Sequence, residues 1–139
     1  MKLLLMALTG LLVYPAPQSV LELEAEKVAS AWSEETVGLL EDLLAEGGIL
    51  LHLPDEEHIK IRPRQARAAI SSFLGRYGTG ETSVTRVSLS GEPAERGFAE
   101  ITWRTSSPGL SEPVIFTLFV AFLNADDRWT VTEIRVLFR

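Results

Sequence analysis

Histidine and acidic side chains cluster in one short segment, HLPDEEH, which runs from His52 to His58. Imidazole nitrogens and carboxylate oxygens this close in sequence can bind a divalent metal ion or share a proton. The same residues are also typical of two short strands, Ile49–Leu53 and His58–Arg62, joined by a polar turn at Pro54–Glu57.

The strand pairing decides whether the two histidines can act together. If Leu53 pairs with His58, then His52 pairs with Ile59, and the two imidazoles project from opposite faces. A slip in the loop brings them to the same side, so a shared site stays as the alternative. We interpret the segment as a solvated acidic turn that includes Asp55, Glu56 and Glu57, and we predict no metal site.

The remaining charged residues form no catalytic constellation in the sequence. Glu100 and Arg104 fall on the polar face of one predicted strand, and Glu133 and Arg135 share a face of the last strand, where they can pair in solvent. The sequence contains no Ser-His-Asp order, no glycine-rich phosphate loop and no carboxylate dyad. We therefore predict no catalytic residue and no cofactor.

Composition excludes several classes of protein. The chain has 139 residues, enough for one domain with a proper core, and it has no cysteine, so disulfide and thiol chemistry are excluded. A net charge of −6 argues against a nucleic-acid partner. The cluster of Arg62, Arg64 and Arg67 is interpreted as a solvated helix face.

The elements that would position any site are clearest at the C-terminal end. Apolar and β-branched runs at Val114–Leu123 and Trp129–Phe138, with a polar connector between them, predict a long antiparallel hairpin. Both faces of the first run are apolar, which predicts a central strand covered on both sides. The order of helices followed by antiparallel strands is typical of an α+β domain.

Three helices are predicted before these long strands. Ser19 and Glu22 form a capping box for a helix that runs to about Trp32, and Ser33 caps a second helix that ends at Gly47 and Gly48. The third helix follows Pro63 and covers Arg64–Tyr77. The predicted apolar stripe of the first helix is Leu21, Ala25, Val28 and Trp32, and that of the second is Leu39, Leu40, Leu43 and Leu44.

The N-terminal residues are typical of an export signal. Lys2 precedes an apolar stretch, Leu3–Val13, that is followed by Pro15 and Pro17. The stretch is shorter than the about 20 residues that a membrane-spanning helix needs. We predict a signal peptide at residues 1–19, a single domain at residues 20–139, and a periplasmic or extracellular bacterial location; a hydrophobic first element of the domain is the alternative.

The chain resembles a known superfamily in three segments: AWSEETVGLLEDLLAEGGILLHL, RQARAAISSFL and DRWTVTEIRVLF. In these, and in the order of its elements, it is similar to the nuclear transport factor 2-like superfamily, and within it to small exported bacterial domains of unknown function. The likeness covers residues 22–138 and departs from the pattern at Arg62-Pro63, where a serine cap is expected. It implies a cone-shaped fold in which three N-terminal helices pack in the concavity of a curved, mostly antiparallel sheet, with a pocket between them and often a dimer.

Two binding functions and one enzymatic alternative follow. A small apolar ligand would occupy the cone, against Trp32, Phe73 and Trp103, although for each of these aromatics taken singly a place in the core is the better interpretation. A partner protein, most simply a second copy of the chain, would pack on the sheet face that carries Ile115, Thr117 and Phe119. The alternative is a pocket enzyme of the isomerase or dehydratase type, which would need a carboxylate or a His–Asp pair inside the cone.

The export prediction has a direct test. Expression in a Gram-negative host should yield a mature protein that begins between Pro17 and Leu21, because the apolar stretch and the breaking prolines end there. Intact mass of the periplasmic fraction measures this. A full-length chain recovered from the cytosol would contradict the prediction.

Overall fold

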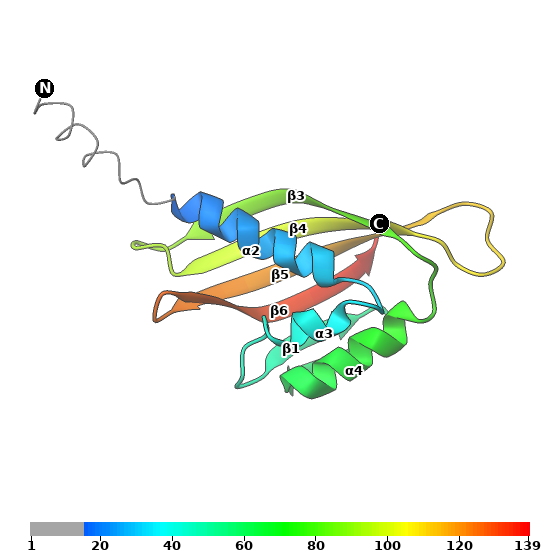
Figure 1. Cartoon of the computed structure of the whole chain (residues 1–139), viewed down its shortest axis with the longest axis horizontal. Coiled ribbons are helices and arrows are strands. Elements are labelled where there is room, and N and C mark those ends of the chain that lie inside the picture. Colours follow the sequence, from blue (N-terminus) through cyan, green and yellow to red (C-terminus); the bar gives the residue numbers. More distant parts are fainter. Residues whose placement is uncertain (1–15) are drawn as a thin grey trace, which may run out of the picture.

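The computed structural model describes residues 16–139, which form three helices on one face of a six-stranded sheet (Figure 1). The predicted α+β class is confirmed. The predicted signal peptide lies outside the described residues except for residues 16–19. No helix in the described part of the chain is long and apolar enough to cross a membrane. The elements are α2 (Pro17–Ala31), α3 (Val37–Glu41), β1 (Ile49–Leu53), β2 (Glu56–Ile61), α4 (Pro63–Leu74), β3 (Glu81–Ser90), β4 (Arg96–Thr105), β5 (Val114–Ala125) and β6 (Arg128–Phe138).

The sheet has the strand order β2-β1-β6-β5-β4-β3. All neighbouring strands are antiparallel except β1 and β6, which run parallel with Leu51 opposite Ile134. Helix α2 lies over the half of the sheet that contains β3 and β4, whereas α3 and α4 lie over the half that contains β1 (Figure 1). The last strand of the chain is thus in the middle of the sheet.

Helix α2 begins earlier than the sequence predicted. Pro17 occupies its first turn, where a fixed φ and a missing N–H are tolerated, and Ala16 is the N-cap residue without a side-chain hydrogen bond. The predicted capping box at Ser19 is therefore wrong. The predicted apolar stripe is confirmed, since every member is buried: Leu21, Ala25, Val28 and Trp32.

The second helix is the least well predicted element. Ser33 caps only a turn, in which its Oγ accepts a hydrogen bond from the Thr36 amide, and α3 then ends at Glu41 rather than at Gly47. Leu39, predicted to be buried, is 64% exposed. The chain leaves the helix because Leu43 and Ala45 exchange backbone hydrogen bonds with Val131 of β6, which extends the parallel pairing instead.

Strand β5 has the two-faced character predicted from the sequence. Between Phe116 and Phe122 its helix-facing side chains are buried, and the alternate ones lie on the opposite side of the sheet. The turn to β6 is only Asp126 and Asp127, both with positive φ, as two-residue hairpin turns require. The helix-facing residues are Phe116, Leu118, Val120 and Phe122, and the opposite residues are Ile115, Thr117, Phe119, Ala121 and Leu123.

Gly97 allows α2 to lie close to β4. A Cβ at this position would meet both methyl groups of Leu21, which is fully buried between helix and sheet. We expect Gly97→Ala to lower the free energy of unfolding by about 1–3 kcal/mol, because a packed core has no room for an extra methyl group. Urea unfolding measures it.

Gly47→Ala is the matched control, because nothing lies within 4 Å of a Cβ built there. It should change the free energy of unfolding by no more than about 0.5 kcal/mol. Equal effects of the two substitutions would contradict the close approach of α2 to β4.

Candidate functional site

The histidine and acid segment forms a tight hairpin. Strands β1 and β2 pair with Leu53 opposite Glu56, His52 opposite Glu57 and Leu51 opposite His58. The turn is therefore shorter than predicted, and Glu56 and Glu57 belong to β2. The two imidazoles still project from opposite faces of the sheet, because residues 51 and 52 alternate.

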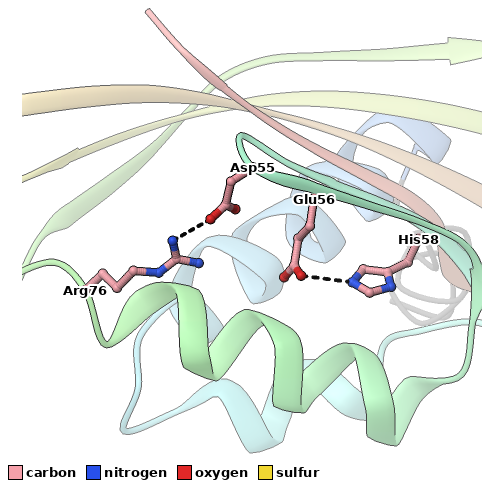
Figure 2. Close-up of polar contacts among 4 residues, drawn as sticks. All are labelled: Asp55, Glu56, His58 and Arg76. Carbon is pink, nitrogen blue, oxygen red and sulfur yellow. Dashed lines mark hydrogen bonds and ion pairs between the residues drawn. The ribbon is translucent and has the colours of Figure 1, made fainter.

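The polar contacts of this hairpin lie on the surface above α4 (Figure 2). Glu56 approaches His58 at 3.5 Å, and Asp55 accepts a 2.6 Å hydrogen bond from Arg76, just beyond the end of α4. This bond lowers the pKa of Asp55 and raises that of Arg76. No group of three or more acidic or histidine side chains in the described chain is placed to hold a metal ion. The hairpin thus carries surface ion pairs.

The three predicted pocket residues are all buried but do not share one role. Trp32 and Trp103 pack edge to face with ring centroids 5.9 Å apart. Phe73 packs on Trp103 and Phe116, and it lies in the filled interior of the cone. The structure therefore places Trp32 and Trp103, but not Phe73, in the wall of a cavity.

That cavity, which we call the mouth cavity, has a volume of about 510 Å³ and lies where α2 and α4 both end. Tyr77 completes its aromatic wall, with its ring centroid 5.5 Å from that of Trp103. The other residues that line it are small or polar: Ala29, Ser30, Ser33, Glu34, Glu35, Leu74, Gly78, Thr79, Gly80 and Thr82.

Gly80 keeps one edge of the mouth cavity open. A Cβ at Gly80 would lie 2.5 Å from Nε1 of Trp103 and 2.7 Å from the Arg104 carbonyl oxygen, so only glycine leaves this edge of the indole clear. The Nε1 of Trp32 is buried and has no hydrogen-bond acceptor among residues 16–139. A buried N–H without an acceptor costs about 1–3 kcal/mol, and Trp32 carries this cost inside the protein rather than at the surface of the cavity.

The opposite side of the sheet, which we call the open sheet face, is covered by no helix of the described chain (Figure 1). Ile115, Thr117 and Phe119, predicted as interface residues, lie on it, and Phe119 is 38% exposed. Ion pairs flank Phe119: Arg86 with Glu100 at 3.6 Å, and Arg135 with Glu133 at 2.7 Å. Two shallow hollows of about 270 and 350 Å³ lie on the same face.

The sequence missed part of the mouth cavity for identifiable reasons. Tyr77 was placed at the end of the third helix, but α4 ends at Leu74, and Tyr77 turns in beside Trp103. Glu34 follows the predicted helix cap Ser33 in the sequence, and in the structure its carboxylate lies against Gly75 at the end of α4. The sequence does place an aromatic residue, Tyr77, among glycines at 75, 78 and 80, and this pattern could have indicated an earlier end of the helix with an aromatic side chain beside it.

Comparison with protein-family models and with curated proteins finds no match. Solved structures do match. A ketosteroid isomerase-like protein from Erwinia carotovora atroseptica superposes with a TM-score of 0.73 at 11% identity, over 90% of this chain and 98% of that one. A DUF4783 family protein from Bacteroides uniformis gives 0.64 at 17% identity, over 82% and 95%. An LEH-like epoxide hydrolase of Mycobacterium tuberculosis gives a TM-score of 0.58 at 19% identity, over 84% of this chain and 80% of that one. These likenesses confirm the fold.

Proposed function

We propose that this domain, which has the nuclear transport factor 2-like fold, binds a small organic molecule in the mouth cavity. The observation that carries the proposal is a cavity of about 510 Å³ at the end of the cone, whose wall contains the partly exposed Tyr77 and the buried Trp32 and Trp103 behind small and polar residues. Small-molecule sites are concave, mostly apolar and about 300–1,000 Å³ in volume, with a few polar groups that fix orientation.

The wall of the mouth cavity is rigid, which favours binding. Trp103 contacts Trp32, Phe73, Tyr77 and Phe116 with centroid distances of 4.8 to 5.9 Å, so its ring cannot move without disturbing the core. A pre-formed wall loses little conformational freedom when a ligand arrives. The interior of the cone holds no comparable space for a ligand, because Phe73 and Phe116 fill it.

The distribution of ionisable groups favours binding over catalysis. A pocket isomerase or dehydratase needs a general base beside the reacting carbon, within hydrogen-bond reach. The acids that line the mouth cavity, Glu34 and Glu35, are both exposed at its rim. The similar structures include a ketosteroid isomerase-like protein and an LEH-like epoxide hydrolase, so catalysis is the alternative function. Analysis of the products formed from a bound ligand would reveal it.

The proposal includes export of the domain. It is supported by Lys2, by the apolar stretch Leu3–Val13 and by the start of α2 at Pro17, directly beyond that stretch. Cleavage near Pro17 would leave α2 and its buried Leu21 in the mature protein.

Filling the mouth cavity should abolish binding. Ser30 is exposed on the last turn of α2 and lines the cavity, so Ser30→Trp should occupy the space without disturbing the core. Saturation-transfer NMR with benzyl alcohol and 3,3-dimethyl-1-butanol as probes should show contact with the wild type and at least a tenfold weaker effect with the variant. Native mass spectrometry of protein from its own host tests for a retained ligand.

Lys27→Trp is the matched control, because Lys27 is exposed on the same helix but does not line the mouth cavity. It should bind the probes as the wild type does. Equal probe binding by Ser30→Trp and the wild type would show that the cavity is not the site.

A second candidate function, self-association, rests on the open sheet face. Four large apolar side chains there are 38–48% exposed: Phe98, Phe119, Leu123 and Leu137. A stable interface buries about 800 Å² per subunit, of which about 500 Å² is apolar. Burial of this apolar surface contributes on the order of 12 kcal/mol per subunit before the cost of association is subtracted. The flanking ion pairs can re-pair across a two-fold axis. We propose a homodimer through this face.

Phe119→Glu should convert the dimer to a folded monomer, because it places a charge in the interface and leaves the helix-facing core intact. Sedimentation velocity at micromolar concentration measures the change. Leu23→Glu, at a 63% exposed position on α2, is the control and should remain dimeric. A monomeric wild type would refute the dimer.

A further inference from the structure

We infer that the ligand of the mouth cavity is a small organic cation, with an ammonium group at the acidic rim. The inference rests on the proposed function and deepens it, because it names the chemical class of the ligand. Three independent features of the cavity favour positive charge: its side-chain charges, the two helix ends that meet there, and its aromatic wall.

The first feature is an uncompensated negative charge. Glu34 and Glu35 are the charged side chains that line the mouth cavity, and no lysine, arginine or histidine of the described chain lines it with them. Arg76 lies close in sequence to Tyr77, but it donates to Asp55 at 2.6 Å and stacks over the Phe73 ring at 5.5 Å. The rim carboxylates therefore lack a cation of their own.

The second feature is the direction of two helices. Helices α2 and α4 run the same way across the sheet and end at the same edge of the molecule (Figure 1). Ser30 in the last turn of α2 and Leu74, the final residue of α4, both line the mouth cavity. A helix C-terminus carries a partial negative charge, and neither helix has a basic residue in its last turn to offset it. Both helix ends thus favour a cation over an anion in the cavity.

The third feature is the chemistry of the wall. Tyr77, which packs on the buried Trp103, is the partly exposed ring of the wall, and a cation near the face of such a ring is attracted. The wall suits an alkylated ammonium group better than a metal ion, because methyl groups pack on rings whereas a metal ion needs several close oxygen or nitrogen ligands. Residues 16–139 contain no group of three such side chains placed to hold one.

Three probes of nearly the same shape and different charge test the inference. Choline is the cation, 3,3-dimethyl-1-butanol the neutral isostere and 3,3-dimethylbutanoate the anion. NMR titration of the full-length protein at low salt should give choline an affinity about tenfold above the neutral alcohol, and the anion the weakest binding. All measurable binding should be lost in Ser30→Trp.

The rim carboxylates are tested separately from the overall charge of the protein. Glu34→Gln/Glu35→Gln should reduce the affinity for choline at least threefold and leave that for the neutral alcohol unchanged. Glu56→Gln/Glu57→Gln, which removes the same charge from the distant hairpin, should leave both unchanged.

The outcomes separate the two claims. Equal, Ser30→Trp-sensitive binding of choline and the neutral alcohol would overturn the charge inference and leave the proposed function standing. Equal loss of choline affinity in both double variants would also overturn it, because a general charge effect would then explain the preference. Binding of none of the three probes would overturn both claims.

Discussion

Strand β5 has apolar side chains on both faces, and the three helices of the described chain cover only one of them. This constraint organises the rest of the molecule. On the covered side, Phe116 and Leu118 are fully buried and bring α2 and α4 onto the same sheet. On the other side, Phe119 stays partly exposed between two ion pairs. The apolar side chains of β5 are therefore buried on the helix side of the sheet and partly exposed on the open sheet face.

Between the helices and the sheet, aromatic side chains fill most of the interior. Phe73, Trp103 and Phe116 pack edge to face or stacked along the axis of the cone, and little space remains between them. The mouth cavity lies beyond Leu74, where α4 ends and glycines at 75, 78 and 80 carry the chain to β3. The same rings that complete the core thus form the wall of the mouth cavity, and stability and binding share residues.

The sequence predicted well whatever depends on periodicity. The alternation in β5 and the stripe Leu21, Ala25 and Val28 give the faces correctly, because burial of apolar side chains is the dominant local signal. It predicted poorly whatever depends on distant partners. The exposed Leu39 and the early end of α3 follow from hydrogen bonds to Val131, far along the chain, which no local pattern contains. The candidate site was half predicted: Trp32 and Trp103 were named, but Tyr77 and the rim acids needed the three-dimensional positions of both helix ends.

The parallel pairing of β1 with β6 bears on the order in which the molecule can assemble. Leu51 lies beside Ile134, so β1 is held in the sheet by β6, which is synthesised after all the other strands described here. Only the short hairpin partner β2 is available to β1 before then. Such long-range pairing slows folding, because the chain loses the entropy of closing a large loop before the stabilising contacts between the two strands form. A nascent chain therefore cannot complete its sheet until β6 has left the ribosome, and its unpaired strands stay accessible to chaperones until then.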